Sequence, residues 1–280
     1  MSEQLTVSQR QRLVELNASF DQLDRVFVDR IGRDLFYKEK ESELSKINKE
    51  KIQHLVCSSH RPLVFTLEQN LIKWLTEDEG FTQVITPIII SEKALDKMTI
   101  TSDHPLTSQV FWLDGKKCLR PMLAPNLYEL MGDMHKVLRQ PVQIFESGPC
   151  FRKETQGAQH MNEFTMLNLV ELAATAEGGQ MERLKQLARD AMKVVGIEDY
   201  ELEITTSEVY GETLDIVACG VELASGAFGP HPLDAKWGIF ETWVGIGFGL
   251  ERLAMVKAGY QNIKRVGRSL AYLDGARLNV

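Results

Sequence analysis

The 280-residue sequence lacks the features that mark membrane, secreted and disulfide-stapled proteins. No apolar run approaches the roughly 18 residues that cross a bilayer, and the N-terminus has no basic start or apolar core like those of a secretory signal. The four cysteines lie far apart and form no CxxC pair, so we expect isolated thiols rather than a disulfide or zinc framework. These absences predict a cytoplasmic protein with no membrane partner.

A large excess of positive charge is also missing. The net charge is −7, which argues against a protein coated in basic surface for nucleic acid. Between residues 256 and 280, however, Asp274 is accompanied by five basic residues: Lys257, Lys264, Arg265, Arg268 and Arg277. This local patch could contact a polyanion, and a solvated chain end explains the same charges equally well.

The first 60 residues differ in character from the rest. Residues 8–55 contain no proline and repeat apolar positions every three or four residues, so they predict helices, with Gly32 as a break. The turn-like segment 57–62 marks the expected boundary between a helical segment, 1–60, and a larger domain, 61–280.

The larger domain mixes strands and helices without alternating them. An amphipathic helix over 67–75 stops at Gly80, and a strand over 81–90 carries Pro87 inside it. The other expected elements are a hairpin around Asp114-Gly115 (109–113 and 117–121), helices over 124–138 and 178–196, two long strands within 142–172 joined by a polar loop, short strands between 200 and 229, and a glycine-rich strand entering a helix over 242–259. This order predicts an α+β fold with a mostly antiparallel sheet flanked by helices.

Charged residues stand at the end of an expected strand. Arg152 and Glu154 would share one face, where a planar guanidinium suits a phosphate oxygen and a carboxylate suits an amine or a ribose hydroxyl. A salt bridge at the strand edge is the competing interpretation. Phe164, beyond the polar loop, could lie flat on a purine ring, although an unaided phenylalanine is more often part of a core.

Glycines recur at alternate positions of the last expected strand. Gly245, Gly247 and Gly249 strip one face of side chains, so a flat ligand could lie against the backbone. Arg252 then opens a helix, where its guanidinium can meet a phosphate near the helix N-terminus. A dinucleotide-binding fingerprint is a weaker interpretation, because no βαβ unit precedes the glycines.

Together these patterns resemble the three motifs of the class II aminoacyl-tRNA synthetases. ITPII around Pro87 resembles motif 1, Arg152-x-Glu154 before a loop resembles motif 2, and GxGxGxER at 245–252 resembles motif 3. Longer stretches are similar to the pyrrolysyl-tRNA synthetase family: LRPMLAPNLYELM (119–131), FRKETQGAQHMNEFTMLNL (151–169), VYGETLD (209–215), VELASGAFGPHPLD (221–234) and WVGIGFGLERL (243–253).

The resemblance covers about residues 60–280, which corresponds to the family's catalytic domain. Residues 1–60 are similar more loosely to the helical tRNA-binding segment that precedes that domain. The chain is most similar to the bacterial-type form, which lacks the family's separate N-terminal tRNA-binding domain.

The resemblance implies a site for ATP and Mg²⁺. Its residues would be Arg152, Glu154, His160, Met161, Phe164, Met166, Glu222, Ser225 and Arg252. Arg152 and Arg252 would be the catalytic cations, on the α- and γ-phosphates. Glu222 and Ser225 would hold the magnesium ion, which needs few protein ligands when phosphate oxygens complete its shell.

The resemblance also implies an amino acid pocket. Its residues would be Ala124, Leu127, Tyr128, Met131, Asn168, Val170, Tyr210, Ala227, Trp243 and Gly245. Asn168 would bond the carbonyl of a long substrate side chain, and Tyr210 would reach over the pocket. An asparagine bonded to nearby backbone is the alternative. Departures from archaeal members at Met131, Val170, Ala227 and Ile246 change the volume by a methyl or two, which bears on substrate preference and not on the ATP chemistry.

The implied function is ligation of pyrrolysine to tRNA(Pyl) through an aminoacyl-adenylate, by a homodimer built on motif 1. Residues 1–60 and the basic C-terminal stretch are candidate tRNA contacts, and a separate tRNA-binding protein is a further candidate partner. Two alternatives remain: a class II synthetase for another large amino acid, such as phenylalanine or phosphoserine, and a catalytically silent RNA-binding paralogue. Loss of Arg152 or Arg252 would mark the latter, and both are present.

Overall fold

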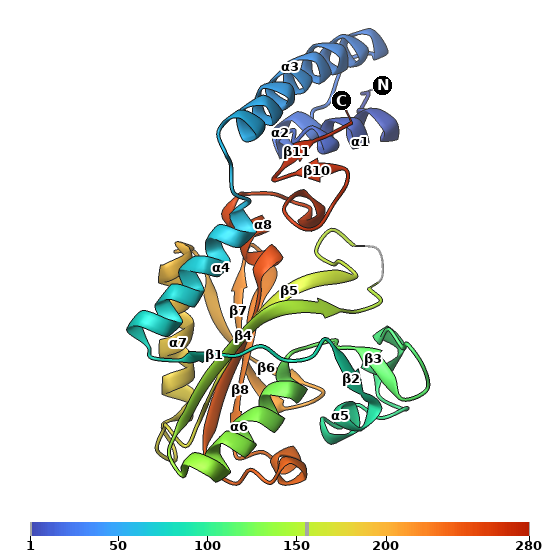
Figure 1. Ribbon diagram of the computed structural model, residues 1–280. Coiled ribbons are helices and arrows are strands. Elements are labelled where there is room, and N and C mark those ends of the chain that lie inside the picture. The colour runs from blue at the N-terminus through green and yellow to red at the C-terminus, as the bar shows by residue number, and fades with distance from the viewer. Residues whose placement is uncertain (1, 155–156, 280) are drawn as a thin grey trace. The chain divides into compact units, whose positions relative to one another are not determined.

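The computed structural model describes residues 2–154 and 157–279 (Figure 1). It divides into two compact units, Met1–Pro62 with Lys264–Val280, and Leu63–Ile263. We expected all of 61–280 in one domain, whereas residues 264–279 group with the N-terminal helices. In the described part of the chain, no helix is long and apolar enough to cross a membrane.

The described residues of the first unit form three α-helices and a short hairpin. These elements are α1 (Val7–Glu15), α2 (Phe20–Leu23), α3 (Arg30–Cys57), β10 (Tyr272–Leu273) and β11 (Ala276–Arg277). Leu13, Leu16, Leu23 and Phe27 form its core. The predicted break at Gly32 is wrong: Gly32 lies in the first turn of α3, where its N–H donates to the N-cap Asp29 carboxylate at 2.8 Å.

Two sets of hydrogen bonds hold the C-terminal residues in this unit. The Arg265 guanidinium donates to the carbonyls of Val14 (2.7 Å) and Glu15 (2.8 Å) at the end of α1. The Asn48 side chain on α3 exchanges two hydrogen bonds with the backbone of Arg277, at 2.8 and 2.7 Å. A cation that caps a helix from a distant segment leaves no local sequence pattern. The sequence therefore did not predict that the C-terminal residues belong to the first unit.

The described residues of the second unit form a seven-stranded sheet with the order β1-β4-β5-β9-β8-β7-β6. Its strands are β1 (Thr82–Gln83), β4 (Val142–Phe151), β5 (Glu163–Leu172), β6 (Glu201–Ser207), β7 (Gly211–Ala218), β8 (Val221–Gly229) and β9 (Trp243–Gly249). β1 pairs with β4 in parallel and the other neighbours are antiparallel. The predicted α+β class with a mostly antiparallel sheet is confirmed.

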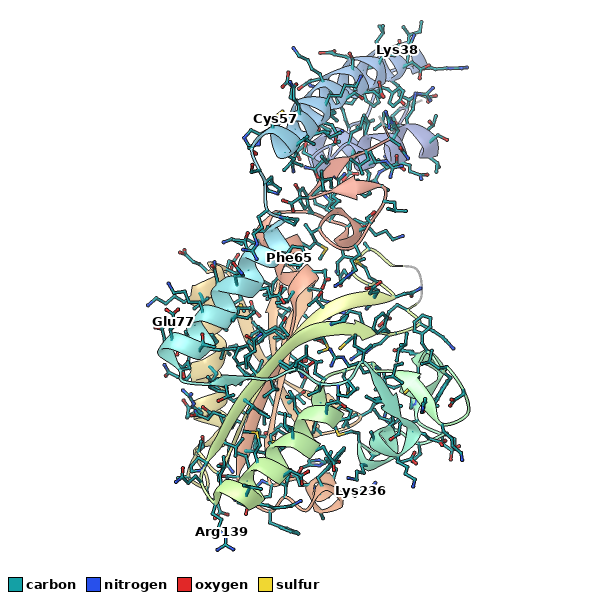
Figure 2. All side chains as sticks on the ribbon, viewed as in Figure 1. Lys38, Cys57, Phe65, Glu77, Arg139 and Lys236 are labelled. Carbon is teal, nitrogen blue, oxygen red and sulfur yellow. The ribbon has the colours of Figure 1, made fainter. Side chains whose placement is uncertain are left out.

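Helices cover both faces of this sheet (Figure 1). The helices α4 (Leu63–Lys73), α7 (Gln180–Val195) and α8 (Leu250–Lys257) pack together on one face, and α6 (Ala124–Leu138) lies on the other. The predicted helix over 124–138 is confirmed. It ends at Arg139, whose φ is 53° and whose side chain points away from the sheet (Figure 2). A π-helical turn, η1 (Trp74–Asp78), follows α4, and Gly80 with φ of 74° ends it as predicted.

The region before α6 differs most from expectation. The predicted strand over 81–90 is wrong: β1 ends at Gln83, and β2 (Ile89–Ser91) begins beyond Pro87. Between them Thr86 bonds through its N–H and hydroxyl to the buried carboxylate of Glu146, at 3.2 and 2.5 Å, instead of joining a ladder.

The expected hairpin around Asp114 is present, because Trp112 and Cys118 form an antiparallel bridge flanked by the backbone hydrogen bonds Leu113–Lys117 and Leu119–Phe111. Only its second arm, β3 (Lys117–Leu119), is a regular strand, and it also pairs with β2. The remaining short elements are α5 (Glu92–Lys97) and the 3-10 helices η2 (Pro105–Gln109), η3 (Pro232–Trp237) and η4 (Ile263–Arg265).

Candidate functional site

A cavity of about 500 Å³ lies on the face of the sheet that α6 covers. Every residue that the sequence analysis assigned to the nucleotide or to the amino acid lines this cavity. They come from α6, the segment between β4 and β5, β5 itself, the β6–β7 turn, β8, β9 and the start of α8. Residues up to 128 positions apart, Ala124 and Arg252, therefore share one space.

Two guanidinium groups line the polar end of the cavity. Arg152 directly follows β4, and its Nε donates to the carbonyl of Pro121 at 2.9 Å. Arg252, in the first turn of α8, donates from Nη1 to the Glu222 carbonyl at 3.0 Å and to its carboxylate at 3.3 Å. Burial lowers the pKa of Arg152, and the positive charge of Arg252 lowers it further. Two cations that repel one another across an open space make a site that favours a polyanion.

The strand prediction for Arg152 needs correction. β4 ends at Phe151, and the Arg152 N–H bonds to the carbonyl of Asn162, so strand alternation does not place Arg152 and Glu154. Both side chains nevertheless line the cavity, and no ion pair joins them among the described residues. Thr155 and Gln156, in the polar loop of motif 2, lie outside the described residues.

An aromatic ring and a bare stretch of backbone flank these cations. The Arg152 guanidinium carbon lies 5.5 Å from the centre of the Phe164 ring, which lines the cavity from β5. On β9, a Cβ on Gly247 would lie 3.0 Å from the amide of Asn168, and one on Gly245 would lie 3.2 Å from a backbone carbonyl. A side chain at either position would therefore crowd β5, and glycine lets Asn168 and the β5 backbone lie close against β9.

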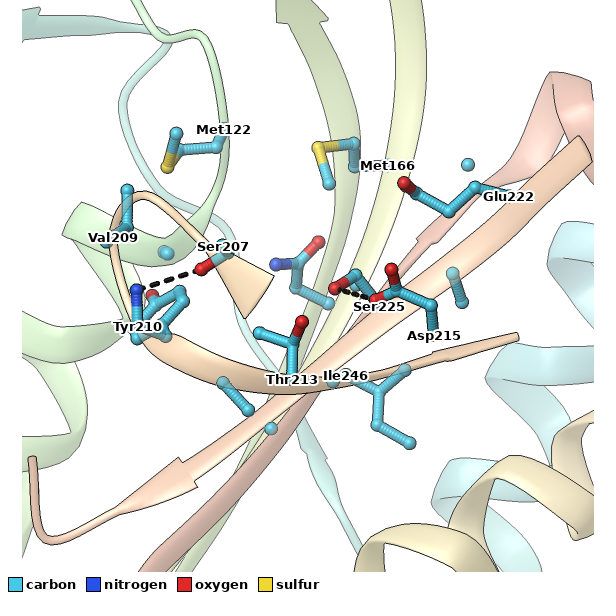
Figure 3. Close-up of a pocket in the computed structure, with 18 of the residues that line it drawn as sticks. Met122, Met166, Ser207, Val209, Tyr210, Thr213, Asp215, Glu222, Ser225 and Ile246 are labelled. Atoms are coloured by element: carbon cyan, nitrogen blue, oxygen red, sulfur yellow. Dashed lines mark hydrogen bonds between the residues drawn. The ribbon is translucent and has the colours of Figure 1, made fainter. Parts of the chain in front are cut away.

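Oxygen ligands gather beside Arg252. Glu222 is exposed on β8, and Ser225 lies three residues further along the same strand. The Ser225 hydroxyl donates to the carboxylate of Asp215 at 2.6 Å (Figure 3). The Thr205 hydroxyl donates to the other oxygen of that carboxylate at 2.6 Å. Because a carboxylate only accepts, the Ser225 proton is directed to Asp215, and the lone pairs of its oxygen stay available for a cation.

Protein ligands alone do not build a metal centre here. Among the described residues, no three His, Cys, Asp or Glu side chains come together as a metal site. Glu222 and Ser225 offer two oxygens, which fits Mg²⁺ because that ion takes one or two protein oxygens together with phosphate and water.

The other end of the cavity has mostly apolar walls around one buried amide. Its walls are Ala124, Leu127, Tyr128, Met131, Val170, Ala227 and Trp243. Among them the Oδ1 of Asn168 is buried and has no hydrogen-bond partner in the described residues. The alternative of an asparagine satisfied by backbone is therefore wrong for this atom. An unpaired buried amide oxygen costs free energy and points to a polar ligand group at this position.

Tyr210 lies in the turn between β6 and β7, at the apolar end. Its ring meets Trp243 edge-on with centres 5.9 Å apart, and its N–H donates to the Ser207 hydroxyl at 2.9 Å (Figure 3). Burial raises the pKa of Tyr210 and of Tyr128 well above the usual range, so both stay neutral phenols that can donate and accept hydrogen bonds.

Comparisons with known proteins show which family this chain resembles. Residues 51–274 match the model of the family described as tRNA synthetases class II core domain (F). A crystal structure of pyrrolysyl-tRNA synthetase from Desulfitobacterium hafniense is 52% identical, with 100% of both chains covered and a TM-score of 0.92. A second structure of a pyrrolysyl-tRNA synthetase from that organism is 51% identical, covers 99% of this chain and 96% of its own, and has a TM-score of 0.90.

A more distant relative is the O-phosphoserine–tRNA(Cys) ligase of Methanocorpusculum labreanum. It is 20% identical over 246 residues, which are 81% of this chain and 46% of the relative. The chain therefore spans less than half the length of that curated relative.

The sheet, the residues of motifs 2 and 3 that line one cavity, and the family model agree on a class. The chain belongs to the class II aminoacyl-tRNA synthetases, a class of tRNA ligases. Within that class it belongs to the pyrrolysyl-tRNA synthetase family, because two solved members share 52% and 51% sequence identity with it over 100% and 99% of its length.

Proposed function

We propose that this chain ligates pyrrolysine to tRNA(Pyl) in two steps. The amino acid carboxylate attacks the α-phosphorus of ATP, so that an acyl–phosphate bond forms, the α–β phosphoanhydride breaks and pyrophosphate leaves. A terminal ribose hydroxyl of the tRNA then attacks the acyl carbonyl, and AMP leaves with the bonding electrons. The observation that carries this proposal is one cavity with two arginines at one end and apolar walls around an unpaired amide oxygen at the other.

The polar end suits the triphosphate. Arg152 would meet the α-phosphate and Arg252 the γ-phosphate, while Phe164 stacks on the adenine and Glu154 accepts from its amine. Charge moves onto phosphate oxygens as the reaction proceeds, so fixed cations contribute more than an acid–base pair would. The Pro121 carbonyl that accepts from Arg152 fixes that guanidinium before the nucleotide arrives.

Glu222 and Ser225 would hold Mg²⁺ with the phosphates. The ion would neutralise phosphate charge when bound. Asp215 supports this role because it accepts the hydrogen bond of the Ser225 hydroxyl, which leaves the lone pairs of the serine oxygen free to face a cation.

The apolar end suits the long side chain of pyrrolysine. The walls would bury its ring, and the Asn168 amide carries both a donor and an acceptor, which match the N–H and carbonyl of the substrate's side-chain amide. Phosphoserine, the substrate named for the distant relative, would need cations at this end, and the residues at this end include none.

The remaining partners are proposals of the same kind. The helical residues 1–60 and the basic stretch 256–280 would contact tRNA, with or without a separate tRNA-binding protein, in the cytoplasm. Motif 1 would build a homodimer, since Ile85 is 94% exposed and Ile88 and Ile89 are 40% and 51% exposed.

Pyrophosphate exchange with pyrrolysine, phenylalanine and phosphoserine in parallel tests the function. We expect exchange that depends on pyrrolysine. Exchange with phenylalanine alone would overturn the substrate assignment, and absence of exchange with every amino acid would favour the silent RNA-binding paralogue.

The Arg252→Ala variant tests the site in the same assay. We expect exchange to fall at least 100-fold with the melting temperature retained, because a cation facing developing charge is removed. Arg10→Ala is the control, since Arg10 pairs with Asp24 in the first unit and should leave exchange unchanged. Normal exchange by Arg252→Ala would contradict the assignment.

A further inference from the structure

A buried acid beside the apolar end of the cavity has no role in the chemistry described so far. Asp234 lies in η3 and is 1% exposed. One carboxylate oxygen, Oδ2, accepts from the Trp243 indole N–H at 2.7 Å and from the His231 backbone N–H at 2.6 Å. The other, Oδ1, accepts from the Tyr128 hydroxyl at 3.1 Å.

The two side chains that Asp234 holds are walls of the cavity. Tyr128 and Trp243 pack edge-to-face with ring centres 5.5 Å apart, and Trp243 also meets the Tyr210 ring. An indole N–H can only donate, so an acceptor opposite it fixes the rotation of the ring. The backbone of Gly229 packs closely against the indole as well, since a Cβ at this position would lie 1.9 Å from the Trp243 Nε1.

A carboxylate is costly at this depth. The partners that the structure gives Asp234 are neutral donors, so its charge is stabilised by three hydrogen bonds rather than by a cation. An apolar residue would fill the same volume without that cost, but it would leave the Trp243 and Tyr128 donors unpaired. What the carboxylate adds is the orientation of two rings.

We propose that Asp234 is a positioning residue for substrate selection. By holding Tyr128 and Trp243 it sets the shape of the apolar end of the cavity, and so decides which amino acid side chains enter. The inference rests on the proposed function, in which this end receives the side chain.

The variants Asp234→Ala and Asp234→Asn test whether Asp234 orients the Tyr128 and Trp243 rings or only fills space in the core. The alanine variant removes both acceptors, and we expect the KM for pyrrolysine in pyrophosphate exchange to rise at least 10-fold, the KM for ATP to stay within twofold and the preference over phenylalanine to fall. The asparagine variant keeps an oxygen for Trp243 and His231 and can donate from its amide to the Tyr128 oxygen. We therefore expect it to restore the KM to within about threefold of the starting value.

Glu171→Gln is the matched control. Glu171 is equally buried, at 1% exposure, but it faces α7 and pairs with Arg183 at 2.6 Å away from the cavity. We expect this variant to lower the melting temperature and leave both KM values unchanged. A rise in the pyrrolysine KM for Glu171→Gln as large as for Asp234→Ala would assign the effect to stability and overturn the inference.

Other variants and constants give further tests. If Asp234→Ala does not fold, Tyr128→Phe removes only the hydroxyl that bonds Asp234, and an unchanged pyrrolysine KM in that variant would overturn the inference. Equal rises of the pyrrolysine and ATP KM values in Asp234→Ala would do the same. Absence of pyrrolysine-dependent exchange in the unmodified chain would instead refute the proposed function.

Discussion

Single side chains divide the cavity into a charged and an apolar end, and Asn168 is the polar exception in the apolar end. Its unpaired Oδ1 carries a desolvation cost that a bound amide would relieve. Asp215 and Asp234 act on the same scale, because each directs the proton or the ring of a neighbour that lines the cavity. The chemistry of the cavity is therefore set partly by two acids that orient lining residues, Asp215 from within the cavity wall and Asp234 from behind it.

Asn168→Ala should separate amino acid selection from ATP binding. We expect the KM for pyrrolysine to rise about 5- to 100-fold, the range that loss of a buried hydrogen bond gives, with the KM for ATP unchanged. Because Oδ1 has no partner without substrate, the melting temperature should hardly change. Pyrophosphate exchange with each substrate varied in turn measures both constants, and an equal loss of both would contradict the pocket assignment.

At the scale of elements, a buried ion pair joins β4, the segment between β1 and β2, and the segment before α6. Arg120, 2% exposed, donates to Glu146 on β4 at 2.7 Å, to the Thr86 hydroxyl at 3.1 Å and to the Pro149 carbonyl at 2.9 Å. Its own carbonyl accepts from the Phe151 N–H, next to Arg152. The segment of motif 1 and the chain next to the arginine of motif 2 are thus held by the same buried residue, through its side chain and its backbone carbonyl respectively.

Gly148→Ala should break this arrangement. A Cβ on Gly148 would lie 2.3 Å from Nη2 of Arg120, so the guanidinium must leave Glu146. Disruption of a buried pair predicts a loss of about 3 kcal/mol in the free energy of unfolding, measured by urea denaturation. Gly115→Ala is the control, since open space surrounds Gly115 and its stability should change by less than about 0.5 kcal/mol. Identical midpoints for the two variants would disprove the role of Gly148.

At the scale of the whole molecule, the prediction concerns assembly. Ile85, Ile88 and Ile89 are exposed around the rigidly held Thr86 and Pro87. Ile85→Glu should convert a dimer to a monomer in sedimentation velocity, because the interface would have to bury a charge. Val137→Glu, at an 81% exposed position near the end of α6, should leave the dimer intact. A monomeric parent chain, or a dimer that survives Ile85→Glu, would contradict the assignment of motif 1.

The sequence alone determined the elements whose pattern is local. The helix over 124–138, the long strands within 142–172 and the class of the fold follow from periodicity and from glycine and proline positions. The motif residues were identified from a family resemblance, which rests on short stretches of consecutive residues. None of these needs knowledge of distant contacts.

Tertiary structure decided the rest. Thr86 left the expected strand because Glu146, 60 positions away, offers it a better acceptor. Asp234 escaped notice because its bond to Tyr128 spans 106 positions. A hydrogen bond between distant segments forms only when packing brings a donor and an acceptor together, so neighbouring residues carry no trace of it.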